Sequence, residues 1–161
     1  MTIKVGDKIP SISLKRATAD GKIEDVTTDD YFAGRKVVLF AVPGAFTPTC
    51  SGQHLPGFVD KASDLRAKGA DAIACISVND AFVMGAWAKD RSVGESVDML
   101  ADGSGDFAKA VDLEMDGSKF GMGTRAQRFA LIADDGVVTH LAVEAPMKFE
   151  VSSAEAILDA L

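Results

Sequence analysis

The chain has 161 residues and a formal net charge of −7, which argues against a general affinity for nucleic acid or for anionic membranes. No apolar run approaches the ~20 residues that a membrane-spanning helix needs, and the N-terminal residues lack the apolar stretch of a secretory signal. Two cysteines are too few for a disulfide framework. We therefore expect a single domain over residues 1–161, located in the cytoplasm, with no nucleic-acid or membrane partner.

The first hundred or so residues alternate strand patterns with helix patterns. Strands are expected at residues 12–14, 22–26, 36–42, 72–78 and 97–101. Helices are expected at residues 28–34, 48–68 and 81–89, with a short one near residue 107. Asp20-Gly21 signals a hairpin turn between the first two strands, and Asn79 or Asp80 caps the helix that follows. The strand at 36–42 is apolar throughout, as expected of a central strand covered on both faces.

The rest of the chain carries a second hairpin and a terminal helix. Its strands are expected at residues 128–133 and 137–143 around Asp135-Gly136, and Ser152 or Ser153 caps a helix that ends at Leu161. This order predicts a three-layer α/β/α domain with a mixed central sheet and an N-terminal β-hairpin. The helix after the strand at 36–42 begins at the carboxyl end of that strand, which is where α/β sheets place their chemistry.

Cys50 is the most informative residue, because of the residues that lead into it. Thr47 fits the N-cap of the helix and Pro48 fits its first position, so Cys50 falls in the first turn. Unpaired backbone N–H groups and the positive end of the helix dipole favour a thiolate there. His54 lies one turn further on, and it could act as a base or form a metal pair with Cys50. Zinc sites use three or four protein ligands, so we expect a surface or packing histidine, with no metal and no cofactor.

The stretch from Pro43 to Cys50 matches the Pro-x-x-x-Thr-x-x-Cys signature of the peroxiredoxins. Residues 42–60 and 75–83 and the Arg-x-x-Arg segment at 125–128 resemble the type II, peroxiredoxin-5-like branch. The resemblance implies a thioredoxin-like fold, a homodimer and thiol-dependent reduction of hydrogen peroxide and organic hydroperoxides, with peroxynitrite as a further candidate. The resemblance further implies that Cys50 is the peroxidatic cysteine, the one that attacks the peroxide, and that Pro43, Thr47 and Arg128 complete the active site.

Ionisation of the thiol alone cannot account for such an activity. An ordinary thiol is already a few per cent thiolate at pH 7, so full ionisation gains at most roughly 30-fold, or about 2 kcal/mol. Enzymes commonly supply ~8 kcal/mol or more, so the remainder must come from orienting the peroxide and stabilising the leaving oxygen.

The residues before Cys50 offer groups for these tasks. The Thr47 hydroxyl can donate and accept, and Gly44 lets the backbone approach a ligand closely. Pro43 fixes the loop and shields the thiolate from water. Gly44, Phe46 and the Cys50 backbone are expected to contact the peroxide, although Phe46 could instead belong to a subunit contact or serve only in packing. Trp87 is expected in the core rather than at the rim of the peroxide pocket.

An arginine would add a permanent positive charge and several donors in one plane. Arg125 and Arg128 differ by an odd step along a strand, so they should face opposite sides. Arg128 shares a face with Ala126 and Ala130, where there is room for a long side chain, and the resemblance also selects it. Arg125 could still reach the rim if a bulge shifts the register.

The sulfenic acid formed at Cys50 must then be reduced. Cys75 lies in an apolar strand and is expected to be structural, with a resolving role as the alternative. We therefore expect an external reductant, either glutathione with glutaredoxin or thioredoxin. A thioredoxin-type dithiol exchange is disfavoured, because Ser51-Gly52-Gln53 supplies no second cysteine. A redox-sensing or holdase-like interaction protein using the same cysteine is the other alternative.

Overall fold

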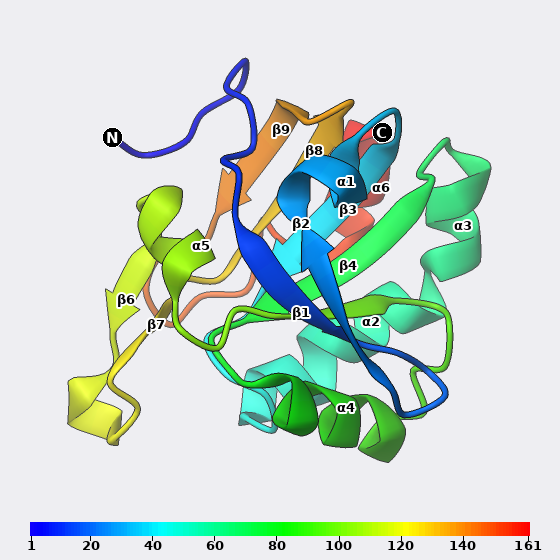
Figure 1. The fold of residues 1–161 in the computed structure, drawn as a ribbon. Coiled ribbons are helices and arrows are strands. Elements are labelled where there is room, and N and C mark those ends of the chain that lie inside the picture. Colours follow the sequence, from blue (N-terminus) through cyan, green and yellow to red (C-terminus); the bar gives the residue numbers. More distant parts are fainter.

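The computed structural model describes residues 1–161 and contains a seven-stranded mixed sheet in the order β2-β1-β5-β4-β3-β8-β9 (Figure 1). Its strands are β1 (Ser13–Ala17), β2 (Ile23–Thr27), β3 (Lys36–Ala41), β4 (Ala72–Ser77), β5 (Asp98–Ala101), β8 (Phe129–Asp134) and β9 (Val137–Val143). Strands β3, β4 and β5 are parallel, whereas β1 runs antiparallel to β5 and β8 antiparallel to β3. The mixed sheet and the N-terminal hairpin of β1 and β2 confirm the predicted architecture.

Helices cover both faces of this sheet. The helical elements are α1 (Thr28–Phe32), η1 (Cys50–His54), α2 (Leu55–Asp60), α3 (Ala62–Ala67), α4 (Ala81–Asp90), α5 (Asp106–Ala110), η2 (Ser118–Phe120) and α6 (Ala154–Ala160). Buried residues of η1, α2, α3, α4 and α6 form one apolar cluster with the sheet, and those of α1 and α5 form another. Ten-residue α4 is the longest helix, and no helix has the length and hydropathy to cross a membrane.

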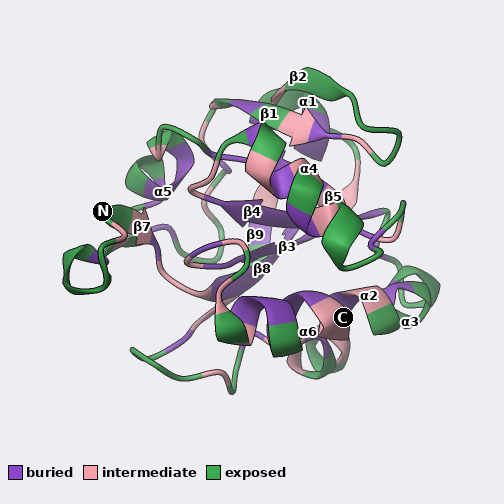
Figure 2. Ribbon diagram, turned by 90° about the horizontal axis from the view of Figure 1, so that it is seen from below, coloured by how far each residue is buried: buried purple, intermediate pink, exposed green.

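The two core clusters follow directly from the alternation of side chains along the central strands. Val38, Phe40, Ile73 and Cys75 point into the first cluster. Val37, Leu39, Ala72 and Ala74 point into the second. Both faces of β3 and β4 are therefore dry, as the continuous apolar run predicted, and these strands are buried in Figure 2.

The local predictions agree with the structure at some positions and differ at others. Thr27 caps α1 by accepting from the Asp30 amide, and the helix ends at Phe32, two residues before the expected end at residue 34. Asp80 caps α4 and Ser153 caps α6, which confirms one of the two expected residues at each helix. A small ribbon of β6 (Glu114–Asp116) and β7 (Thr124–Ala126) was not predicted, because these three-residue strands carry almost no periodic signal.

The helix expected at 48–68 is divided into three pieces. Helical backbone begins at Pro48, η1 is a π-helical turn, and Lys61 separates α2 from α3 with φ −98° and ψ 6°. Pro56 has no N–H, and its ring would clash with the carbonyl four residues earlier in a regular α-helix. The wider π turn lies directly before that proline, and its Leu55 amide bonds the Cys50 carbonyl. The helix is thus irregular just before Pro56-Gly57, in a turn that includes Cys50.

Candidate active site

Cys50 lies just beyond the carboxyl end of β3, where the chain turns into a helix. The Val42 amide still bonds the neighbouring strand, at the Ile76 carbonyl, and the loop from Pro43 to Thr47 follows. The Ser51 amide donates to the Thr47 carbonyl over 2.9 Å, which closes the first helical turn. Cys50 is therefore in that turn, as predicted from the Thr-Pro-Thr lead-in.

Arg128 makes the direct contact with this sulfur. Its Nη2 donates to the Cys50 Sγ over 3.2 Å, and its Nη1 lies 2.9 Å from the His54 Nδ1. Arg128 precedes β8, and its backbone carbonyl accepts from the Glu144 amide. The guanidinium therefore places a permanent positive charge beside the sulfur.

Arg125 is used differently. Its Nε donates to the Met122 carbonyl and its Nη1 to the Val78 carbonyl, so it braces backbone instead of reaching Cys50. The structure therefore distinguishes the two arginines that the strand pattern alone could only assign to opposite faces.

His54 is the part of this site that the sequence did not reveal. Its side chain is completely buried, and its Nε2 lies 2.9 Å from the Ser152 carbonyl. Burial, reinforced by the charge of Arg128, lowers the pKa of His54 to about 3, so the ring is neutral at physiological pH. Since a carbonyl only accepts, Nε2 carries the proton and Nδ1 accepts from Arg128. The only sequence signal was the four-residue spacing from Cys50.

The loop before Cys50 is tightly braced. The Thr47 hydroxyl donates to the Gly44 carbonyl over 2.7 Å, so it does not cap the helix as expected, and its lone pairs remain available. The Ala45 amide donates to the Asn79 Oδ1, so Asn79 holds this loop and does not cap α4. A Cβ on Gly44 would lie 3.1 Å from the Met122 methyl and 3.2 Å from the Thr47 methyl, so a larger residue here would require these side chains to shift.

Phe46 and Trp87 are two neighbouring aromatic residues at this loop, one exposed and one buried. Phe46 has a left-handed backbone, with φ 65°, and its ring is half exposed. Trp87 is buried, as expected of a core residue, and its Nε1 donates to the Ser51 Oγ over 2.9 Å. The two rings are 6.4 Å apart, so the loop packs on α4 through them, whereas η1 contacts α4 through the bond between Ser51 and Trp87.

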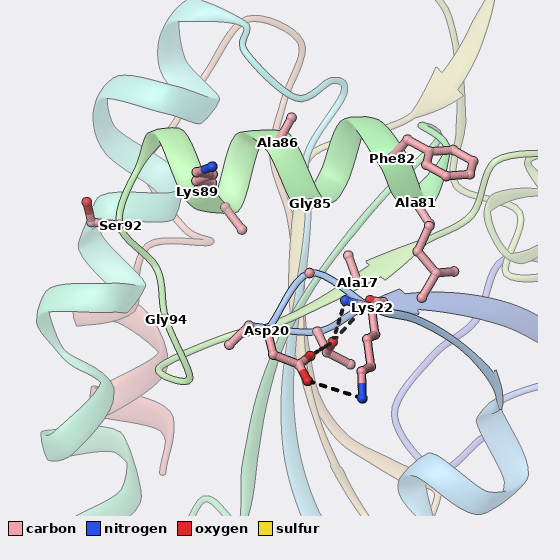
Figure 3. A pocket seen from close by; sticks show the side chains of 15 residues that line it. Ala17, Asp20, Lys22, Ala81, Phe82, Gly85, Ala86, Lys89, Ser92 and Gly94 are labelled. Carbon is pink, nitrogen blue, oxygen red and sulfur yellow. Dashed lines mark hydrogen bonds and ion pairs between the residues drawn. The ribbon is translucent and has the colours of Figure 1, made fainter.

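Cys50 itself has no exposed surface in this structure. A peroxide therefore reaches the sulfur only when a neighbouring side chain moves. The groove drawn in Figure 3, between the β1–β2 turn and α4, does not offer a route, because neither Cys50 nor Arg128 lines it. No group of three or more His, Cys, Asp or Glu side chains is placed to hold a metal ion.

Cys75 is the second free thiol. It lies in β4 between Phe40 of β3 and Met99 of β5, and it is completely buried in the same apolar cluster as Cys50. Burial, with a smaller contribution from Cys50, raises the pKa of the Cys75 thiol. A buried, protonated thiol in a central strand is a poor nucleophile.

The mixed sheet and the thiol at the start of a helix, in contact with a guanidinium, define a thiol-based oxidoreductase of thioredoxin-like fold. The model of the Redoxin family matches residues 4–158. Peroxiredoxin-2E-2, chloroplastic, of Oryza sativa subsp. japonica is 54% identical over 99% of this chain and 73% of its own length.

Two solved structures agree with this match. Reduced Prx3 from Vibrio vulnificus in complex with hydrogen peroxide has a TM-score of 0.93 and 54% identity, covering 99% of each chain. Peroxiredoxin 5 from Alvinella pompejana has a TM-score of 0.84 and 34% identity, covering 98% of this chain and 97% of its own. The chain belongs to the peroxiredoxins, in the type II, peroxiredoxin-5-like branch, and is a thiol peroxidase.

Proposed function

We propose that this peroxiredoxin reduces hydrogen peroxide and small organic hydroperoxides through a sulfenic acid at Cys50. The thiolate attacks one peroxide oxygen, the O–O bond breaks, and the second oxygen leaves with the electron pair and takes up a proton. The products are the Cys50 sulfenic acid and water or an alcohol. The observation that carries the proposal is the 3.2 Å contact between the Arg128 guanidinium and the Cys50 sulfur at the start of a helix.

The neighbouring groups divide the work of the reaction. Arg128 has further N–H groups that can hold a peroxide oxygen while its charge favours the thiolate. The Thr47 hydroxyl donates to Gly44, so its lone pairs are free to accept from the peroxide O–H. The Cys50 amide offers a donor to the leaving oxygen, and Pro43 keeps bulk water from the sulfur. Phe46 and Gly44 form the entrance on the loop side.

The hydrogen peroxide complex of the Vibrio vulnificus relative supports that peroxide as a substrate of this chain. The small residues around Gly44 and Ala45 suit a compact molecule, and organic hydroperoxides and peroxynitrite present the same O–O group.

An external thiol completes the cycle. One thiol attacks the sulfenic acid sulfur and releases water, and a second thiol then reduces the mixed disulfide. We infer glutathione with glutaredoxin, or thioredoxin, as the source of both thiols, because the buried Cys75 is poorly placed to resolve the sulfenic acid.

We further infer one domain over residues 1–161, a homodimer and a cytoplasmic location. Both apolar clusters are built on one sheet, which supports a single domain. The half-exposed Phe46 beside the site supports a subunit contact. The name of the rice relative places that protein in the chloroplast, so fractionation of the native cell decides between the two compartments.

A steady-state assay with hydrogen peroxide and each reductant tests the function. Cys50→Ser should lose essentially all turnover, because a hydroxyl cannot replace the thiolate. Full peroxidase activity in Cys50→Ser would disprove the proposal. Oxidation of Cys50 without turnover under any reductant would favour a redox-sensing or holdase-like role instead.

The external reductant has its own test in Cys75→Ala. This variant should keep its turnover with at least one external thiol system, and intact mass should show a glutathione adduct on Cys50 after peroxide and glutathione. Loss of turnover with every reductant, with the first oxidation step preserved, would instead make Cys75 the resolving cysteine. The cost in stability should be about 1 kcal/mol, since a buried sulfur is removed.

A further inference from the structure

The geometry points to His54 as a positioning residue that fixes the Arg128 guanidinium against the Cys50 sulfur. This inference rests on the proposed roles of Cys50 and Arg128. It assigns a task to a buried polar side chain that neither the signature nor the sequence pattern explains.

Arg128 contacts both His54 and Cys50 through one guanidinium group. Two nitrogens of one planar guanidinium are engaged, Nη1 at 2.9 Å from the His54 Nδ1 and Nη2 at 3.2 Å from the Cys50 Sγ. An arginine side chain has several rotatable bonds, and a single contact leaves the plane free to turn. The second contact, at His54, fixes the plane, so that Nη2 points at the sulfur.

The group that accepts from Arg128 at His54 carries no charge. Arg128 forms no ion pair with any carboxylate within 4.0 Å, as the ion pairs of the chain all involve other residues. The low pKa of His54 keeps its ring neutral. A neutral acceptor orients the guanidinium without cancelling its positive charge, which remains available to the thiolate and to a peroxide oxygen.

Both ring nitrogens of His54 are held by hydrogen bonds. Its Nε2 donates to the Ser152 carbonyl, and the Ser152 amide and hydroxyl donate to the Glu144 carboxylate over 2.8 and 2.7 Å. The Glu144 amide donates to the Arg128 carbonyl over 2.9 Å. The backbone and the side chain of Arg128 are thus joined in one closed ring of hydrogen bonds.

The Glu144 carboxylate is the anchor of this ring. It also accepts from the Glu150 and Val151 amides, each over 2.9 Å. Burial opposes its charge, but these hydrogen bonds outweigh the burial and keep the pKa of Glu144 below its ordinary value. The aromatic rings of Phe40, Phe58 and Phe149 surround His54, so its ring cannot turn freely.

Two amide substitutions separate the two hydrogen bonds of His54. In His54→Asn the amide oxygen can occupy the place of Nδ1, which retains the acceptor for Arg128. In His54→Gln the amide nitrogen can occupy the place of Nε2, which retains the bond to Ser152 and removes the acceptor. The readouts are the pH profile of Cys50 alkylation by iodoacetamide and the rate constant of oxidation by hydrogen peroxide.

We expect His54→Gln to move the alkylation profile to higher pH and to lower the oxidation rate constant about tenfold, the scale of one hydrogen bond to a charged group. His54→Asn should stay within about threefold of the wild type. In an Arg128→Gln background, His54→Gln should have no further effect. Equal behaviour of both variants, a larger loss in His54→Asn, or an undiminished effect in that background would overturn the inference.

A measurement on the unmodified protein covers the case in which a variant does not fold. Correlation of the ring protons and nitrogens of His54 by NMR at pH 7 should show a neutral ring protonated on Nε2. A ring protonated on Nδ1, or a charged ring, would overturn the inference. Failure of the proposed function is a separate result, since it appears as full activity in Cys50→Ser with His54 intact.

Discussion

At the scale of single residues, Cys50 obtains its chemical environment from two distant parts of the chain. The local part is the helix start that places the sulfur near unpaired amides. The distant part is Arg128, 78 residues further along, whose Nη2 contacts the Cys50 sulfur. Neither part is sufficient alone. Thiolate formation accounts for only a small share of the amount by which an enzyme lowers the activation barrier, and the peroxide must also be oriented.

The buried neutral ring of His54 makes a residue-scale prediction about acid stability. The pKa of His54 falls from 6.5 to about 3 on folding, so between these values the unfolded chain binds a proton that the native chain does not. Stability should therefore fall as the pH drops from 6.5 towards 3, by at most about 5 kcal/mol from this group. Urea unfolding at pH 7, 5 and 4 measures the slope.

The matched variants are His54→Asn and His140→Asn. His54→Asn should flatten the acid loss, because the titrating group is gone. His140→Asn should leave it unchanged, because that partly exposed histidine of β9 is outside the buried network. An identical acid slope in the wild type and in His54→Asn would contradict the assignment of a buried, neutral His54.

At the scale of elements, the π turn η1 connects the loop at residues 43–47 to the helices that cover the sheet. Its wider turn provides the Leu55 amide, just before Pro56, with a hydrogen bond to the Cys50 carbonyl. The side chains of η1 contact two different parts of the structure. Ser51 accepts from Trp87 of α4, and His54 contacts the segment before α6 through Ser152. The direction of Cys50 thus depends on packing against both helices.

Ser51→Ala tests the contact between η1 and α4. The variant leaves the Trp87 N–H buried without an acceptor, so the free energy of unfolding should fall by about 1–3 kcal/mol. Adding Ser51→Ala to Trp87→Phe should cost much less, because the unpaired donor is no longer present. Urea titration of the four proteins in a double-mutant cycle gives the coupling, and a coupling near zero would contradict the bond.

At the scale of the whole molecule, the protein presents several large apolar side chains to solvent. The most exposed aromatic rings belong to Phe46, Phe82 and Phe120. Phe46 is the one that belongs to the loop before Cys50, and it retains a left-handed backbone that bulky residues rarely adopt. Covering this ring in a dimer would remove apolar surface from water and stabilise the loop.

Phe46→Asp tests that whole-molecule expectation. Sedimentation velocity should show a dimer for the wild type and a shift towards monomer for Phe46→Asp, because a charge would be buried in the contact. Val5→Asp replaces another exposed apolar residue, in the N-terminal segment, and should leave the dimer unchanged. A monomeric wild type, or equal dissociation of both variants, would contradict the role of Phe46.

The parts of the fold that local patterns control were predictable. The apolar run at 36–42 became β3, Asp20-Gly21 became a hairpin turn, and Pro48 opened a helix that contains Cys50. The form of that helix was not predictable, because Pro56 signals an interruption without specifying whether the chain widens into a π turn or bends. The ribbon of β6 and β7 was missed because each strand has only three residues.

The sequence by itself determined the α/β alternation, the position of Cys50 in a first helical turn and the resemblance to a peroxiredoxin, because these depend on neighbouring residues. Only the tertiary structure decided that Arg128 reaches the sulfur, that Arg125 braces the backbone, and that His54 is buried between Arg128 and Ser152. The contacts of His54 span 74 and 98 residues, so no local pattern encodes them. Hydrogen bonds of buried groups are set by which segments the sheet brings together, and that depends on the whole chain.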